Sequence, residues 1–190
     1  MLKDLILKNR SCRRFYEDEK ISEDTLKDLV DLARLSPSAA NAQPLRYILS
    51  NTPEMNEKIF PHLTWAGYLK EWKGPDVGEK PSAYIIILAN NPVSRMSPHD
   101  AGIAAQSIML GATEIGYGGC IIAAVHRDEL RKELDIKSKH HIFMVLALGK
   151  PKEEVIIEEL PSDGKIEYWR DDKNVHHVPK RTLKDIIVEK

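Results

Sequence analysis

The sequence has no excess of charge of either sign. It contains 28 basic and 29 acidic side chains, which leaves a formal net charge of −1. Without a net positive field, overall charge does not attract the chain to DNA, RNA or an anionic membrane. It also has no apolar run near the ~20 residues that a membrane-spanning helix needs, and its first residues are too charged for a signal peptide. We therefore expect a cytoplasmic protein with no nucleic-acid or membrane partner.

Cysteine is scarce as well, since the chain contains 2, at positions 12 and 120. They form no CxxC pair and no spacing typical of metal ligands, which favours a reducing compartment. We interpret Cys12 as a buried residue, although arginines lie beside it and such neighbours lower a thiol pKa. No metal site is predicted, and we interpret two pairs of adjacent histidines as structural: His140-His141 and His176-His177.

What the sequence does contain is an alternation of apolar strands with helices. Its 190 residues fit one domain, 1–190, with room for a substantial core. The run 83–89 is apolar throughout, as expected of a strand covered on both faces. The alternation predicts a layered α/β or α+β domain. Further strands are expected at 46–50, 120–125 and 142–148, and helices at 2–9, 53–60, 127–134 and 183–187.

Capping residues mark several helix boundaries. Ser22 precedes a helix that Pro37 ends, with core-facing residues at the spacing of an amphipathic helix. Thr52-Pro53 places a cap before a proline at the first helical position. The run Ser97-Pro98-His99-Asp100 resembles a capping box. We therefore expect helices to start after Ser22, Thr52 and Ser97.

The helix that follows Asp100 is apolar nearly all round, to about residue 115. That pattern is typical of a buried helix, either in the core or in a subunit interface. The glycine turn 116–119 is expected to end this helix rather than bind a phosphate, because no lysine follows it.

Two polar segments in the first quarter of the chain suggest a ligand. The run Arg10-Ser11-Cys12-Arg13-Arg14 concentrates three guanidinium groups, which bind phosphate bidentately and stay charged at physiological pH. The loop Pro37-Ser38-Ala39-Ala40-Asn41-Ala42-Gln43-Pro44 offers amide and hydroxyl groups between two prolines. Alone, the first is more often a solvated surface stretch and the second a helix-to-strand connector. Together they indicate a cofactor with a phosphate and a ring.

In this order, the segments resemble the nitroreductase family of FMN-dependent oxidoreductases, and the resemblance covers essentially the whole chain. Arg10-Ser11-x-Arg13 is similar to the family's phosphate and ribityl motif. Pro37-Ser38-x-x-Asn41-x-Gln43-Pro44 is similar to its second flavin motif. The apolar helix, the glycine turn and the strand after it match the family's middle third. Finally, Val178-Pro179-Lys180-Arg181 resembles the basic element near its C-terminus.

The resemblance implies an α+β fold with a mixed central sheet flanked by helices, working as an intertwined homodimer. Residues 151–190 would be a C-terminal extension that wraps the partner subunit. One FMN would lie at each of two interface sites, held by residues of both subunits. By position, the phosphate and ribityl contacts would be Arg10, Ser11 and Arg13, with Lys180 and Arg181 adding charge. The second motif would contribute Pro37, Ser38, Asn41 and Gln43, the first three of them from the partner. Ala123 and Ala124 would offer backbone groups to the flavin ring.

The implied activity is transfer of a hydride from NAD(P)H through FMN to a flat acceptor, such as a nitroaromatic or a quinone, by a ping-pong mechanism. No catalytic side chain is expected, because the flavin itself carries the chemistry. Trp65 and Tyr68 would either stack on a substrate or fill core. Alternatives are a specialised flavin reaction, such as reductive dehalogenation or flavin breakdown, and a module that binds or stores FMN without turnover.

Overall fold

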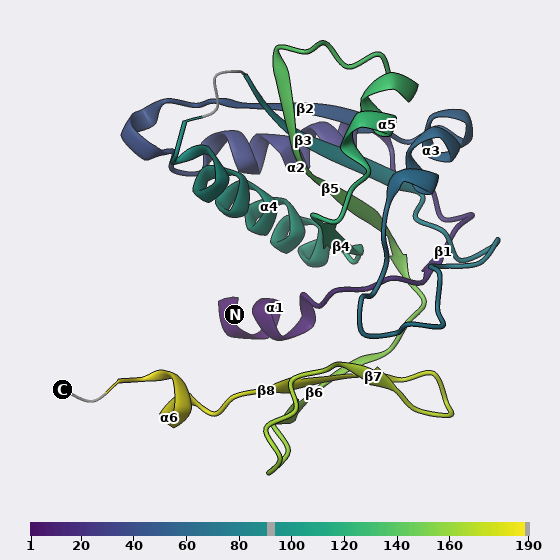
Figure 1. Cartoon of the computed structure of the whole chain (residues 1–190), viewed down its shortest axis with the longest axis vertical. Coiled ribbons are helices and arrows are strands. Elements are labelled where there is room, and N and C mark those ends of the chain that lie inside the picture. The colour runs from purple at the N-terminus through teal and green to yellow at the C-terminus, as the bar shows by residue number, and fades with distance from the viewer. Residues whose placement is uncertain (91–93, 189–190) are drawn as a thin grey trace.

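A five-stranded sheet forms the centre of the structure, a computed structural model that describes residues 1–90 and 94–188 (Figure 1). Strand β5 pairs with β1, β3 and β4, and β2 pairs with β3. These pairs are antiparallel, while a parallel bridge joins Ser11 to Gly119 in β4. The strand bounds are Phe15–Tyr16 for β1, Leu45–Ser50 for β2, Ala83–Asn90 for β3, Gly118–Ile122 for β4 and His140–Pro151 for β5.

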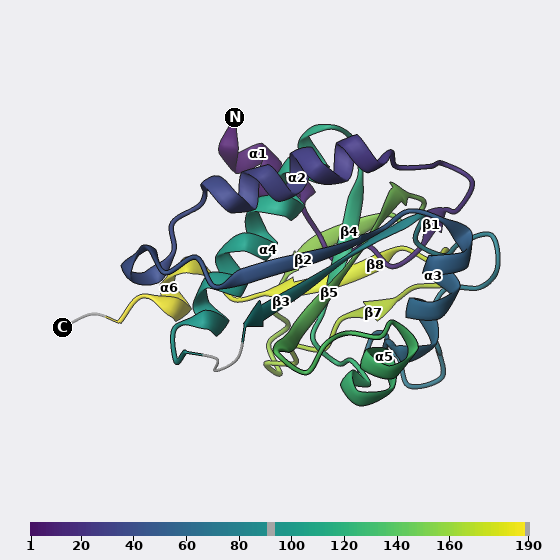
Figure 2. The same ribbon diagram turned by 90° about the horizontal axis from the view of Figure 1, so that it is seen from above.

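Helices cover both faces of this sheet (Figure 2). Successive side chains of a strand point to opposite faces, and β3 follows this rule. Ile85 and Ile87 pack in one buried cluster with residues of α2 and α4. Tyr84 and Ile86 pack in a second cluster on the other face. The predicted strand with two covered faces is therefore confirmed. The helices are α2, Glu23–Leu35, and α4, Ser97–Glu114, on the first face, and α3, Pro53–Ile59, and α5, Arg127–Glu133, on the second.

Two predicted helix starts are confirmed by their hydrogen bonds. The Ser22 hydroxyl accepts from the Thr25 N–H at 3.0 Å at the start of α2. The Thr52 hydroxyl accepts from the Met55 N–H at 3.3 Å at the start of α3, with Pro53 as the first helical residue. Short 3₁₀ turns follow these helices, η1 at Ala39–Asn41 and η2 at Phe60–His62.

The predicted capping box at Ser97 is wrong. Helix α4 begins one residue earlier than that box requires, with Met96 at the cap position and no side-chain cap hydrogen bond. The Ser97 hydroxyl lies 3.0 Å from the Ser94 hydroxyl, and Asp100 bonds to a different segment. The end of α4 is as predicted, because Gly116 adopts a left-handed φ of +82° that favours glycine.

The chain after β5 forms a second, three-stranded sheet (Figure 1). Strand β6, Val155–Glu159, pairs in parallel with β8, His176–Lys180, and β7, Trp169–Arg170, pairs with β8 in antiparallel fashion. This tail sheet lies as a separate layer beneath the main sheet, near α1, Leu2–Lys8, and is followed by α6, Leu183–Ile186. Parallel and antiparallel pairing with flanking helices confirms the predicted α+β class. Wrapping of a partner by the tail stays a prediction.

Several apolar side chains of the tail are partly exposed, among them Ile156, Ile157, Ile166 and Trp169. The tail sheet therefore leaves apolar surface uncovered in the single chain. Across residues 1–90 and 94–188, none of the helices combines the length and the apolar character that crossing a membrane requires.

Candidate functional site

The first arginine motif lines a pocket of about 320 Å³, which we call the first-motif pocket. Its walls come from four parts of the chain: the segment after α1, the middle of α4, strand β4 and the tail sheet. The structure thus brings the predicted residues Arg10, Ser11, Arg13 and Lys180 together. Arg181 is exposed and does not line this pocket. The lining also includes Gln106, Met109, Gly119, Ile121, Tyr168 and His176.

The motif is bonded to the edge of the main sheet. The Cys12 N–H donates to the Gly119 carbonyl at 2.8 Å, and Ser11 forms the bridge to the same residue. Position 119 requires glycine, because an added Cβ would lie 2.2 Å from the Ala147 carbonyl oxygen of β5. Ser11 itself remains exposed. A rigid strand therefore fixes the backbone that presents Ser11 and Arg13.

Arg13 is buried, with 7 % of its surface exposed, and none of the described carboxylates pairs with its guanidinium. One guanidinium nitrogen lies 3.2 Å from Nε2 of His176, and the same nitrogen lies 3.5 Å from the Ser11 carbonyl. The group lies 4.8 Å from the centre of the Tyr168 ring, over its face. All three neighbours are neutral acceptors, so the positive charge of Arg13 is not compensated by them.

The neighbouring arginine has a different role. Arg14 forms a two-pronged ion pair with Glu79, at 2.5 and 2.7 Å, and Lys152 binds the same carboxylate at 3.0 Å. The bond from Arg14 lowers the pKa of Glu79 to about 2. The third guanidinium of the motif is thus used to fasten the loop before β3, and it does not face the pocket.

Arg10 lies at the rim of the pocket and is half-buried. Its guanidinium donates to the carbonyls of Ile6 and Asn9, at 2.9 and 2.6 Å. These bonds satisfy carbonyls at the end of α1, where a helix lacks its own donors. Arg10 therefore caps the end of α1 and carries its positive charge at the rim of the pocket.

A buried carboxylate behind the pocket gave no recognisable signal in the sequence. The Glu153 side chain has no exposed surface and accepts from Arg170 at 3.0 and 2.5 Å. Its other oxygen accepts from the Arg13 backbone N–H at 2.8 Å. Glu153 thus links the first motif to the tail sheet, and its charge is balanced by Arg170 rather than by the Arg13 side chain.

Tyr168 and His176 are further pocket residues that sequence reasoning missed. The Tyr168 ring stacks edge-on with Tyr68 at 5.0 Å between centroids and lies 5.1 Å from the His176 ring. His176 is 1 % exposed. Its burial, with the nearby guanidinium groups, lowers its pKa to about 4. His177, in contrast, points to Glu158 and stacks on Trp169 outside the pocket.

A smaller pocket continues along β4 and shares Arg13 and Ile121 with the first-motif pocket. It brings together the predicted residues Ala123, Ala124 and Trp65. We call it the β4-end pocket.

Both alanines of the β4-end pocket are exposed, and their carbonyls are engaged. Arg127 donates to the Ala123 carbonyl at 2.9 Å, and the Thr64 N–H donates to the Ala124 carbonyl at 2.9 Å. Among the described residues, neither alanine N–H donates a backbone bond outside the regular strands. This leaves two N–H groups at the pocket for a ligand.

The two aromatic residues of the loop before β3 lie in different surroundings. Trp65 is 6 % exposed and packs on Phe60 and Trp72, with ring centroids 5.8 and 6.5 Å away. It is both a core residue and part of the β4-end pocket wall. Tyr68 is 48 % exposed and contacts Tyr168, which lines the first-motif pocket, but Tyr68 itself does not line it.

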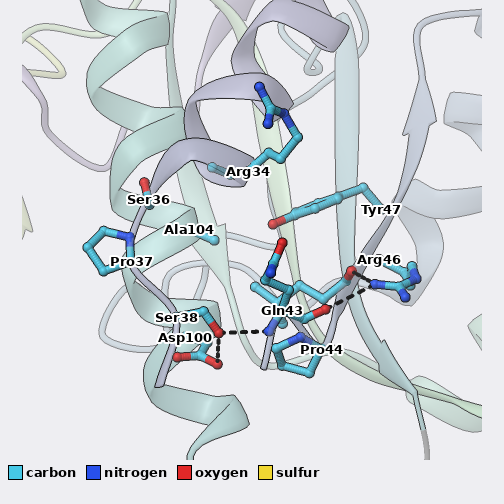
Figure 3. Close-up of a pocket in the computed structure, with 12 residues that line it drawn as sticks. Arg34, Ser36, Pro37, Ser38, Gln43, Pro44, Arg46, Tyr47, Asp100 and Ala104 are labelled. Atoms are coloured by element: carbon cyan, nitrogen blue, oxygen red, sulfur yellow. Dashed lines mark hydrogen bonds between the residues drawn. The ribbon is translucent and has the colours of Figure 1, made fainter. Parts of the chain in front are cut away.

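The second motif lines another pocket, shown in Figure 3, which we call the second-motif pocket. Here Asp100, buried in the first turn of α4, organises the loop. Its carboxylate accepts from the Ser38 hydroxyl and from the Ala39 N–H, both at 2.9 Å. The Ser38 hydroxyl also accepts from the Gln43 N–H at 3.0 Å, as the dashed lines show. Pro37, Ser38 and Gln43 line this pocket, whereas Asn41 lies exposed outside it.

The loop of the second motif is strained. Ala40, Asn41 and Gln43 have φ of +51°, +52° and +48°. Such left-handed conformations cost residues such as Ala40 and Gln43 roughly 1–2 kcal/mol each, while Asn tolerates them better. The Asp100 hydrogen bonds offset this cost. The first-motif and second-motif pockets have no lining residue in common, so one chain does not bring its two predicted motifs together.

Cys12 is buried, as expected. Burial in the first place, and the charge of Glu153 in the second, raise the pKa of its thiol to about 12. The neighbouring arginines therefore do not activate it. In the described part of the chain, no three His, Cys, Asp or Glu side chains are grouped so that they could hold a metal ion.

A model of the nitroreductase family matches residues 6–150. The chain belongs to the nitroreductase family. A candidate NADH dehydrogenase/NAD(P)H nitroreductase from Archaeoglobus fulgidus is 31 % identical over 149 residues, which cover 74 % of this chain and 80 % of the relative. The family predicted from the motifs is thus confirmed, and with it the class of NAD(P)H-dependent oxidoreductase.

Two further similarities bear on activity and fold. An iodotyrosine deiodinase from Thermotoga neapolitana is 26 % identical over 169 residues, covering 80 % of this chain and 89 % of the relative. The solved structure of a candidate nitroreductase from Exiguobacterium sibiricum, in complex with FMN, aligns with a TM-score of 0.66 at 18 % identity. It covers 80 % of this chain and 89 % of that one, which supports the nitroreductase fold.

Proposed function

We propose that this nitroreductase-family chain binds FMN with its phosphate in the first-motif pocket and transfers hydride from NAD(P)H to a flat organic acceptor. FMN is the cofactor of the family. The observation that carries its placement is the guanidinium of Arg13, which is buried, lines the pocket and is held by neutral groups. A buried cation without a counter-ion fits an anionic ligand. Ser11 and Lys180 add a hydroxyl and a second positive charge at the same wall.

The ring system of the cofactor is proposed to lie along β4 toward the β4-end pocket. Arg13 and Ile121 belong to both pockets, so a long ligand can extend from one to the other. At the far end, the N–H groups of Ala123 and Ala124 are free to donate to a ring nitrogen. Arg127 donates to the Ala123 and Val125 carbonyls of this turn and thereby fixes the direction of those N–H groups. A fixed donor aimed at developing negative charge is an effective form of stabilisation.

A second copy of the chain is proposed to complete each site. Pro37, Ser38 and Asn41 lie in or beside a pocket that is separate from the first-motif pocket of the same chain. In a homodimer, the strained loop of one subunit would face the first-motif pocket of the other. The partly exposed apolar residues of the tail sheet would be covered in the same assembly.

When bound, FMN supplies the hydride chemistry, and the protein supplies binding, orientation and electrostatics. NAD(P)H and the acceptor are proposed to occupy the same space beside Tyr68 and the β4-end pocket, one after the other. We therefore expect parallel double-reciprocal plots against NAD(P)H at several acceptor concentrations. Intersecting lines would mean that donor and acceptor bind together, and would exclude the ping-pong mechanism.

Reductive dehalogenation is a second candidate activity, because a relative that aligns over 80 % of this chain is an iodotyrosine deiodinase. Both activities need the same cofactor site and differ in the acceptor. A panel of nitroaromatics, quinones and iodinated phenols, assayed with NADH and NADPH, separates them. An FMN-loaded protein that oxidises neither nucleotide with any acceptor would instead be a flavin-binding module.

The placement of the phosphate is tested with two adjacent arginines. Arg13→Ala should weaken FMN binding by about 1.5–3 kcal/mol, the range for a charge-assisted hydrogen bond. Arg14→Ala should leave FMN affinity unchanged, because that side chain pairs with Glu79 outside the pocket. Titration of the apo-proteins with FMN, followed by flavin fluorescence, measures both. Equal effects of the two substitutions would remove Arg13 from the phosphate site.

A further inference from the structure

Two adjacent arginines of the first motif are held in opposite ways. The Arg14 guanidinium is bound by the Glu79 carboxylate, which also binds Lys152. The Arg13 guanidinium is bound by Nε2 of His176 at 3.2 Å and by a carbonyl, with a Tyr168 ring beneath it. One arginine therefore has a carboxylate partner within the protein, while the other keeps its full charge at the wall of a pocket.

The contact between Arg13 and His176 fixes the state of the imidazole. A guanidinium has donors only, so Nε2 of His176 accepts through its lone pair. The ring is then neutral and carries its hydrogen on Nδ1. No described group accepts that hydrogen in hydrogen-bonding geometry, since the nearest carboxylate oxygen, on Glu153, is 3.9 Å from Nδ1.

The charged groups around His176 explain why it stays neutral. Arg13 faces it from the first motif, Arg170 from β7, and Glu153 from the turn between β5 and β6. His177 is its neighbour along β8. Glu153 is already bound by Arg170 and by the Arg13 backbone N–H, so little of its charge is left to stabilise an imidazolium. Burial and two guanidinium groups act in the other direction.

We propose that His176 is a positioning residue, which aims the Arg13 guanidinium at an anion in the first-motif pocket without neutralising it. The proposal rests on the proposed function, since the anion is the FMN phosphate. A neutral acceptor orients the guanidinium and leaves its charge for the ligand. A carboxylate in the same place would also orient it, but would compete with the phosphate for its charge, as Glu79 does for Arg14.

The test compares FMN with riboflavin, which has the same ring and no phosphate. The ratio of their dissociation constants measures what the phosphate contributes to binding. A residue that only supports the fold would change both constants together. A residue that prepares Arg13 for the phosphate changes the ratio.

Three substitutions and one control resolve the role of His176. His176→Gln keeps a neutral acceptor and should hold the FMN-to-riboflavin ratio within about threefold of the wild type. His176→Leu removes the acceptor and should lower the preference for FMN about tenfold. His176→Glu has the size of Gln but adds a charge, and should lower the preference at least as much as Leu. His177→Gln, whose parent ring stacks on Trp169 away from Arg13, should not change the ratio.

The possible results distinguish a failure of the phosphate placement from a failure of the role proposed for His176. A wild-type protein that binds FMN and riboflavin equally well would overturn the phosphate placement, and the role of His176 with it. A wild-type preference for FMN that persists in the Leu and Glu variants would overturn the role of His176 alone. Should the Leu variant fail to fold, the Gln and Glu variants decide, because they differ in charge and hardly in size. Equal ratios in that pair would then refute the proposal.

Discussion

Each of the two predicted cofactor segments is held by one buried carboxylate. The negative charges of these two carboxylates are stabilised in different ways. Glu153 binds the first motif through the Arg13 N–H and is balanced by the Arg170 guanidinium. Asp100 binds the second motif through a hydroxyl and an N–H, without an ion pair among the described residues. The first motif therefore depends on a charged partner in the tail sheet, and the second depends on uncharged hydrogen-bond donors that bind Asp100 of α4.

This difference indicates how each half of the site is kept in place. Glu153 joins residues 140 positions apart, so the first-motif pocket is complete only when the tail has folded against the motif. Asp100 lies 61 and 62 positions from its partners, and its bonds offset a strained loop. Loss of Glu153 should thus affect the whole fold, and loss of Asp100 mainly one loop.

The largest effect is expected for Glu153→Ala. Removing one partner of a buried ion pair costs about 3–5 kcal/mol, because the other charge stays buried without compensation. Here Arg170 loses its partner and the Arg13 N–H loses its acceptor. Chemical denaturation should show this loss in the free energy of unfolding. The control Glu154→Ala removes an exposed neighbour and should change stability by less than about 0.5 kcal/mol.

Asp100→Asn should have a smaller and more local effect. An amide keeps one oxygen acceptor, so one of the two bonds to the Ser38 hydroxyl and Ala39 N–H is lost. We expect a loss of about 1.5–3 kcal/mol, as for hydrogen bonds to a charged group. Limited proteolysis should find faster cleavage within 36–44, whereas the exposed control Glu114→Gln on the same helix should show none. Unchanged cleavage would mean that the loop is held by its own backbone.

The sequence predicted those features of the two motifs that are decided by residues close together in the chain. Ser22 and Thr52 mark helix starts because a cap bonds to an N–H three residues away. The arginine motif marked a pocket because its residues are close in the chain. Asp100 was interpreted as a capping acid, since nothing near it shows that the Ser38 loop returns to it. Glu153 resembles any acid of a charged segment, and only the folded tail shows that it is buried.

Tyr168 and His176 were missed for a similar reason. His176 lies 163 positions from Arg13, and the sequence contains no periodic pattern that aligns the two. Adjacent histidines suggested only a structural role. The pairing of β6 with β8 decides which of the two rings turns inward, and that pairing is a property of the whole tail sheet.

Acid should weaken the first-motif region in two separate pH windows. The folded pKa of His176 is about 4, lowered from 6.5 by burial, so the unfolded chain binds its proton first. Its contribution to stability is complete above pH 6.5 and is lost as pH falls toward 4. The pKa of Glu79 is lowered from 4.5 to about 2 by Arg14, so its contribution is lost between those values.

Thermal unfolding measured from pH 8 to pH 2.5 distinguishes these windows. His176→Gln should flatten the dependence of the melting temperature on pH between 6.5 and 4 and leave the lower window intact. Glu79→Gln should flatten the lower window only. A His176→Gln variant with the wild-type slope above pH 4.5 would mean that His176 is not held neutral in the folded state.

The smallest effect concerns strain in the second motif, where two neighbouring alanines serve as a matched pair. Ala40 has a φ of +51° in the left-handed region, and Ala42 has a φ of −70°. Ala40→Gly removes a steric cost of roughly 1–2 kcal/mol, against a loss of about 0.5–1 kcal/mol from the greater freedom of the unfolded chain. We expect it to be neutral or slightly stabilising. Ala42→Gly brings only the loss from the greater freedom of the unfolded chain and should destabilise by about 0.5–1 kcal/mol. If Ala40→Gly instead cost as much as Ala42→Gly, the loop would not be strained, and Asp100 would stabilise an already favourable conformation rather than offset a cost.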